Sequence, residues 1–243
     1  MHTQGISSTI WAVVPLKSPD AAKSRLRAGL DADTRRRLFF SMARQVLRTL
    51  ALTPGIAGVS VVTTSPEVSA FAEREDAAVI WEERDAGTAE ACRSAVAHLS
   101  MRVDSLLMIS GDIPLISTEA VAGLLSSHHP VAFGDTPPRA GGETIFSGVV
   151  IAPDRRRSGT NALLCTPPAI IPPCFGADSF QRHLAAARSQ GVDVRIVESH
   201  ALALDIDELE DLDELQRRLD ANPTLLSAEL REALARRAEA PAQ

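Results

Sequence analysis

Short, uninterrupted apolar runs recur along the chain, and amphipathic segments separate most of them. The runs Ile10–Pro15 (IWAVVP) and Ser105–Ile109 (SLLMI) show no polar alternation. Such runs are typical of strands that are buried on both faces of a parallel sheet. On this basis we predict strands at residues 10–15, 59–64, 78–81, 105–109, 149–152, 194–197 and 202–206.

Helical periodicity marks the segments between these runs. Residues 33–52 carry an apolar stripe at spacings of three and four, formed by Leu38, Met42, Val46, Leu47 and Leu50. Similar patterns predict helices at residues 66–73, 87–99, 118–126, 176–190 and 208–219. Strands that alternate with helices in this way predict an α/β fold, with a single three-layer α/β/α domain around a mostly parallel central sheet.

Two segments stand apart from this alternation. Residues 130–147 are rich in proline and glycine and lack periodicity, which indicates a loop or hairpin insertion. Residues 224–239 form a charge-rich amphipathic helix that either packs at the edge of the domain or pairs with another subunit in a homodimer. We therefore assign residues 1–220 to the domain and residues 221–243 to a C-terminal helical tail.

Composition narrows the class of protein. The chain has 243 residues, 45% of them hydrophobic, and a net charge of -6, which argues against a nucleic-acid binder with a broad basic surface. Cys92, Cys165 and Cys174 form no CxxC pair, which favours reduced thiols over disulfides. No apolar run approaches the roughly 18 residues of a membrane span, and residues 1–9 lack the pattern of a signal peptide. We expect a cytoplasmic protein without a membrane partner.

An acidic residue follows the run at 105–109. Gly111 lets the backbone turn tightly, and Pro114 prevents the strand from continuing. Asp112 is therefore expected at the carboxyl edge of the sheet, where ligands bind in open α/β folds, and is a candidate metal ligand. The alternative is that Asp112 only caps the following helix.

A basic loop and a late pair of carboxylates accompany Asp112. Lys17, Lys23 and Arg25 follow the first strand, where they either bind polyphosphate or form a solvated surface. Asp205 and Asp207 alternate, so an extended backbone places both on one side, unless they are only the acidic start of a helix. Together these parts describe a polyanion with Mg²⁺, which takes hard oxygen ligands.

A further anion site is predicted near residue 176. GADSF at 176–180 opens a helix, with Asp178 or Ser179 as N-cap, and free amides at a helix start suit an anion. His183 lies one turn later, and we treat it as a structural helix residue. Residues 154–161, DRRRSGTN, are predicted to form a polar turn.

At this point the chain resembles the phospholactate guanylyltransferases of coenzyme F-420 biosynthesis, which have the Rossmann-like nucleotide-diphospho-sugar transferase fold. The resemblance covers most of residues 10–215. It rests on the order of five motifs: VPLKSPDAAKSRL at 14–26, SGDIPLI at 110–116, GTNALL at 159–164, FGADSFQRHLAAA at 175–187 and LDIDELEDL at 204–212.

The resemblance implies an Mg-dependent enzyme that transfers GMP from GTP to a small phosphorylated carboxylic acid. It implies a catalytic set of Lys17, Lys23, Arg25 and Asp112, and metal ligands Asp112, Asp205 and Asp207. The residues implied to bind the nucleotide are Pro15, Lys17, Lys23, Arg25, Gly87, Thr88 and Gly111. Those implied to bind the carboxylate of the acid are Thr160, Gly176 and Ser179.

One departure from the family bears on substrate choice. The family usually has Gly-Leu-Asn where this chain has Gly87-Thr88-Ala89, so an Asn side chain near the nucleotide is missing. The acid could be 2-phospho-L-lactate, phosphoenolpyruvate or 3-phosphoglycerate. The alternatives are a related enzyme that uses CTP or a molybdopterin-type acceptor, and a nucleotide-binding protein without catalytic activity.

Overall fold

The computed structural model describes residues 9–19, 23–127, 147–222 and 226–235. The strands are β1 (Ile10–Pro15), β2 (Ile56–Thr63), β3 (Ala78–Trp81), β4 (Ser105–Ile109), β5 (Gly148–Pro153), β6 (Thr160–Thr166) and β7 (Asp193–Ile196). The helices are η1 (Ser24–Ala28), α1 (Ala32–Leu52), α2 (Pro66–Arg74), α3 (Thr88–Leu99), α4 (Thr118–Ser126), α5 (Ser179–Ser189), α6 (Leu209–Ala221) and α7 (Ala228–Ala235).

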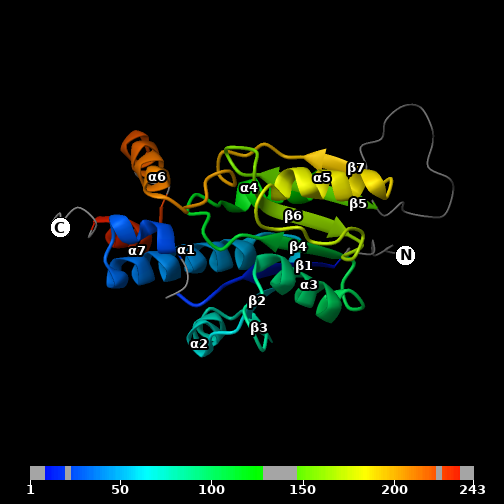
Figure 1. Cartoon of the computed structure of the whole chain (residues 1–243), viewed down its shortest axis with the longest axis horizontal. Coiled ribbons are helices and arrows are strands. Elements are labelled where there is room, and N and C mark those ends of the chain that lie inside the picture. The colour runs from blue at the N-terminus through cyan, green and yellow to red at the C-terminus, as the bar shows by residue number, and fades with distance from the viewer. Residues whose placement is uncertain (1–8, 20–22, 128–146, 223–225, 236–243) are drawn as a thin grey trace, which may run out of the picture.

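The strands form one seven-stranded sheet in the order β3-β2-β1-β4-β6-β5-β7 (Figure 1). Only β6 runs antiparallel to its neighbours, β4 and β5, and the other pairs are parallel. The prediction of a mostly parallel sheet is confirmed. Strand β6 was not predicted, because its polar start at Thr160 and Asn161 was assigned to the preceding turn.

Helices cover both faces of the sheet. One apolar cluster joins β1, β2 and β4 to α1, α2 and α4, and includes Phe39, Phe71 and Leu124. A second cluster on the other face joins the sheet to α3 and α5 through residues such as Cys92 and Phe180. The three-layer architecture that the alternating pattern predicted is therefore confirmed.

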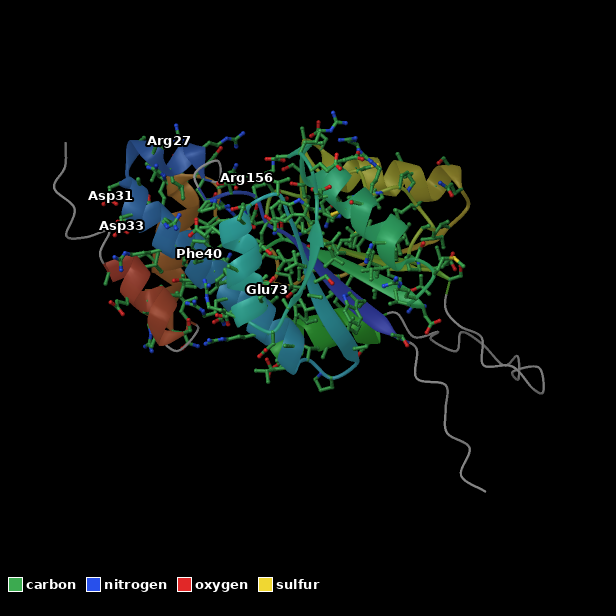
Figure 2. The ribbon with its side chains drawn as sticks, turned by 90° about the horizontal axis from the view of Figure 1, so that it is seen from below. Arg27, Asp31, Asp33, Phe40, Glu73 and Arg156 are labelled. Carbon is green, nitrogen blue, oxygen red and sulfur yellow. The ribbon has the colours of Figure 1, made fainter. Side chains whose placement is uncertain are left out.

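Helix α1 shows why the chain folds in this way locally. Asp31 caps the helix by accepting a hydrogen bond from the Thr34 N–H at 2.7 Å (Figure 2). The apolar stripe with Leu38 and Met42 is buried along one side. Phe40 contacts the ring of Phe71 with a centroid distance of 4.9 Å, so α1 and α2 pack together over the sheet.

A third apolar cluster lies at the N-terminal half of α1 and joins parts of the chain that are far apart in sequence. Leu26 and Leu30 contribute from η1 and the segment after it, Leu212 and Leu215 from α6, and Leu230 from α7. The tail helix therefore packs on its own chain, as the edge-packing alternative expected. Pairing with another subunit stays a prediction.

The strand predicted at residues 202–206 is wrong. Leu202, Leu204 and Ile206 are buried in alternation, as in a strand, but they enter two different apolar clusters. Backbone hydrogen bonds join this segment to loops and not to a neighbouring strand. The Arg155 N–H donates to Ala203 O at 2.8 Å, and the Ile206 N–H donates to Asp112 O at 3.1 Å. The alternation reflects burial of an irregular segment beside the sheet edge.

Two further predictions concern the segment 130–147 and the absence of a membrane span. The segment 130–147 falls almost wholly outside the described residues. Over the ranges that the structure describes, every helix is too short or too polar to cross a membrane. A cytoplasmic location stays a prediction.

Candidate active site

Asp112 stands at the carboxyl edge of the sheet, as predicted. Beyond β4, the Ser110 N–H donates to Asn161 O at 2.8 Å and extends the pairing with β6. Gly111 then passes close to the end of β1: a Cβ there would lie 2.4 Å from Leu16 Cδ2 and 3.2 Å from Val14 Cγ1, so any larger residue would force these side chains to move. The alternative that Asp112 caps a helix is wrong, because α4 is capped by Ser117, which accepts from the Ala120 N–H at 3.2 Å.

Lys23 lies between two carboxylates. It precedes η1 in a left-handed conformation with φ of 56°, and its ammonium contacts Asp112 Oδ2 and, at 3.0 Å, Asp207 Oδ1. Its side chain is only 7% exposed. Burial by itself would lower the pKa of Lys23, but the charges of Asp112 and Asp207 outweigh burial and raise it. Lys23 is therefore a fixed cation and not part of a solvated surface.

Asp205 completes a group of three carboxylates. Asn161 Nδ2 donates to Asp205 Oδ1 at 3.3 Å and to Leu202 O at 2.9 Å, which fixes this segment against β6. Burial, followed by the nearby charges of Asp112 and Asp207, raises the pKa of Asp205 to about 7. The helix-start alternative is wrong for this pair, because α6 begins only at Leu209.

A cavity of about 530 Å³ opens beside these carboxylates. Arg25 also lines it, together with Thr160, Gly176 and Ser179. The structure therefore brings most of the predicted site residues to one cavity, although they come from six separate stretches of sequence. The members of the predicted set that line it are Lys23, Arg25, Thr88, Asp112, Thr160, Gly176, Ser179, Asp205 and Asp207.

Most of the remaining predicted nucleotide residues line a second, smaller cavity, whereas Gly111 is in the lining of neither. Pro15, Lys17 and Gly87 belong to it, and Thr88 borders both cavities. Gly87 has φ of +94°, a conformation that favours glycine, and immediately precedes α3. Lys17 is about half exposed and lies 3.4 Å from Asp85. The two cavities thus adjoin at the start of α3.

Several residues of the larger cavity were not predicted as site residues. Arg155 and Arg156 line it from the turn before β6, and Glu208 pairs with both Arg25 at 3.0 Å and Arg156 at 3.4 Å (Figure 2 labels Arg156). Asn161 was also missed. The run of three arginines was the available signal, but its position follows only once β6 is known to run antiparallel to β4.

Another part of the cavity lining is built by β6 and the start of α5. Gly176 has φ of +114°, and its carbonyl accepts from the Ser179 N–H at 3.2 Å, while the Phe180 N–H donates to Ser158 O. The expectation of free amides at this helix start is thus only partly met. Ser179 and Thr160, both of which carry hydroxyl groups, line the cavity.

The lining fits a divalent cation on three observations. Carboxylates outnumber cations in it: Lys23, Arg25, Arg155 and Arg156 stand against Asp112, Asp154, Asp178, Asp205, Asp207, Glu208 and Asp211. Asp112 Oδ1 is buried without a hydrogen-bond partner. Carboxylate oxygens are also the ligands that Mg²⁺ prefers. No ready-made group of three or more metal-binding side chains occurs in the described ranges, where Lys23 separates Asp112 from Asp207.

Comparisons with solved structures agree with the fold. The chain superimposes on a putative nucleotide-diphospho-sugar transferase from Desulfovibrio desulfuricans with a TM-score of 0.71 at 16% identity, over 96% of both chains. It is also similar to CMP:2-keto-3-deoxy-manno-octonic acid synthetase complexed with CTP, with a TM-score of 0.58 at 14% identity, over 88% of this chain and 99% of the other. The fold is that of the nucleotide-diphospho-sugar transferases.

Sequence comparisons are more specific. A phosphoenolpyruvate guanylyltransferase from Conexibacter woesei is 37% identical over 85% of this chain and 86% of its own. A 3-phospho-D-glycerate guanylyltransferase from Colwellia psychrerythraea is 32% identical over 83% of this chain and 88% of its own. The model of the family described as "Guanylyl transferase CofC like" matches residues 10–220. The chain therefore belongs to the CofC-like guanylyl transferase family.

Proposed function

We propose that this protein transfers GMP from GTP to the phosphate of a small phosphorylated carboxylic acid and releases pyrophosphate, as a step of coenzyme F-420 biosynthesis. The observation that carries this proposal is the larger cavity, which Lys23 and three carboxylates line together with Thr160 and Ser179. One side suits a polyphosphate with a cation, and the other suits a small acid. The names of the relatives point to phosphoenolpyruvate or 3-phosphoglycerate, and 2-phospho-L-lactate has the same groups.

The reaction needs little beyond positioning. A phosphate oxygen of the acid is already anionic near neutral pH, so it can form a bond to the α-phosphorus of GTP without a general base. The bond from the α-phosphorus to the bridging oxygen breaks, and the electron pair leaves with pyrophosphate. Lys17, Lys23 and Arg25 follow β1 and are the cations available to hold the triphosphate.

Asp112, Asp205 and Asp207 are the residues that would hold Mg²⁺. The unpaired, buried Asp112 Oδ1 and the raised pKa of Asp205 both indicate carboxylates short of positive charge. When bound, Mg²⁺ would offset the charge of the phosphate oxygens.

Thr160, Gly176 and Ser179 would bind the carboxylate of the acid. Thr160 and Ser179 line the cavity and carry hydroxyl groups, and the backbone at Gly176 turns there with a positive φ. A site built from hydrogen-bond donors can discriminate strongly between acids, because an ill-fitting acid leaves buried donors without partners. This allows one family to contain enzymes for different acids.

The test combines purified protein, Mg²⁺ and one nucleotide with each of the three acids. We expect pyrophosphate release with GTP, and a product whose mass equals the acid plus GMP less water. Greater turnover with CTP would favour the related cytidylyltransferase. If no nucleotide and acid pair, molybdopterin-type acceptors included, yields pyrophosphate, the chain would be a nucleotide-binding protein without catalytic activity. Sedimentation of the same sample would show whether it is a homodimer.

A further inference from the structure

His183 lies behind the acid-binding wall, and both of its ring nitrogens have partners. It is 0% exposed on the inner face of α5. Its Nδ1 lies 3.0 Å from Thr160 Oγ1, and its Nε2 accepts from the Cys174 N–H at 2.8 Å. Phe175 packs edge-on against the ring with a centroid distance of 5.0 Å. The imidazole therefore joins β6 to the segment that leads into Gly176.

These contacts fix where the ring carries its proton. A backbone N–H can only donate, so Nε2 must be the unprotonated, accepting nitrogen. Burial, with a smaller effect of Arg182, lowers the pKa of His183 to about 4, so the ring is neutral near pH 7. A neutral ring with an unprotonated Nε2 carries its hydrogen on Nδ1. His183 therefore donates to Thr160.

The direction of this hydrogen bond determines what Thr160 can do. Its hydroxyl oxygen accepts from Nδ1–H, so the single hydroxyl hydrogen must point elsewhere. Among the described residues, His183 is the side-chain partner of this hydroxyl, and Thr160 lines the larger cavity. The hydrogen is left for another acceptor, which we infer to be a ligand in that cavity. Such a ligand must present a hydrogen-bond acceptor, as an acid does.

We propose that His183 is a positioning residue that holds the Thr160 hydroxyl as a hydrogen-bond donor to an anionic oxygen of the phosphorylated acid. This inference rests on the proposed function for the identity of the acid. His183 does not touch the acid and acts through Thr160. It also holds Cys174, and with it the approach to Gly176, so the two sides of the acid site keep their separation.

Four variants separate positioning from a structural role. Thr160→Val removes the donor and Thr160→Ser keeps it. His183→Gln keeps an acceptor that can reach Cys174 but loses the donor at Nδ1, whereas His183→Asn keeps an amide donor near Nδ1. We expect Thr160→Val and His183→Gln to weaken binding of the acid by about tenfold or more, as for a lost bond to a charged group. Thr160→Ser and His183→Asn should stay closer to wild type, and GTP affinity should not change.

Calorimetric titration with phosphoenolpyruvate, 2-phospho-L-lactate and 3-phosphoglycerate, each in the presence of Mg²⁺, supplies the binding data. The double variant with Thr160→Val and His183→Gln should bind no worse than Thr160→Val alone, because His183 acts through a group that is already absent. Independent, additive losses, or equal losses for GTP and acid, would overturn the inference. So would an unchanged affinity of Thr160→Val for every acid that the wild-type chain binds, or a wild-type chain that binds none.

A spectroscopic measurement on the wild-type chain is independent of binding. Two-bond ¹H–¹⁵N correlation spectra should show His183 neutral at pH 7, with a protonated Nδ1 and an unprotonated Nε2. A proton on Nε2, or a cationic ring, would overturn the inference even if the enzyme is active. Conversely, a chain with the expected tautomer and acid binding but no pyrophosphate release would overturn the proposed function alone.

Discussion

The buried, neutral His183 has a measurable consequence for stability. Its pKa falls from 6.5 to about 4 on folding, because burial disfavours the charged ring. Between these values the folded chain binds fewer protons than the unfolded chain, so the free energy of unfolding falls as pH is lowered. The contribution of the neutral His183 ring to the free energy of unfolding is complete above pH 6.5 and fully lost below about pH 4. It amounts to about 3 kcal/mol, of which about 2 kcal/mol is lost by pH 5.

Other groups titrate in the same window, so a matched variant is needed. Asp205 has a raised pKa and therefore opposes His183, because its folded form gains protons, and stability, as pH falls from about 7. The wild type and His183→Gln are therefore unfolded in urea without metal at pH 7.5 and at pH 5. Both proteins contain Asp205, so its effect drops out of the difference between their free energies of unfolding. The free energy of unfolding of the wild type, relative to that of His183→Gln, should be about 2 kcal/mol smaller at pH 5 than at pH 7.5. If the difference in the free energy of unfolding between the two proteins is the same at both pH values, His183 is not held neutral.

Three further predictions concern the larger cavity. Asp112→Asn should reduce turnover by at least about 100-fold with an unchanged circular dichroism spectrum, because it removes a carboxylate from the proposed cation site; near wild-type activity at saturating Mg²⁺ would contradict this. Arg25→Ala should weaken GTP binding about tenfold by calorimetry. Arg37→Ala, which only breaks an exposed pair with Asp33 within α1, serves as its control and should have no effect. Ser179→Ala should raise the Michaelis constant for the acid about tenfold and leave that for GTP unchanged, and the reverse pattern would remove Ser179 from the acid site.

Much of the fold could be predicted from periodicity, because most strands of the sheet are buried on both faces. Such strands read as continuous apolar runs, as at Ser105–Ile109. Strand β6 was not predicted, because it begins with two polar residues, Thr160 and Asn161, although it is fully buried. Their polar groups form hydrogen bonds with His183, Leu202 and Asp205. Polar residues that are buried with hydrogen-bond partners do not produce an apolar run in the sequence, so such a strand cannot be recognised from hydrophobicity.

The site could be predicted where function is carried by one residue at a strand end. Asp112 follows the end of β4 after Ser110 and Gly111, so strand polarity alone placed it at the correct edge. Arg156 could not be placed in this way, since it precedes β6 and reaches the same edge only because β6 runs antiparallel to β4. Local sequence patterns do not specify strand direction, and the residues that depend on it were missed.

The ion pairs of the cavity bear on how tightly it can bind phosphate. Glu208 already engages both Arg25 and Arg156, and Lys23 already engages Asp112 and Asp207. A phosphate group that contacts these cations must therefore replace an existing carboxylate, so each new contact is worth less than one with an unpaired cation. Because carboxylates also outnumber cations in the lining, an anionic substrate without a counter-ion meets net repulsion. Affinity for the nucleotide should consequently depend more on an added divalent cation than on any single basic residue of the loop after β1.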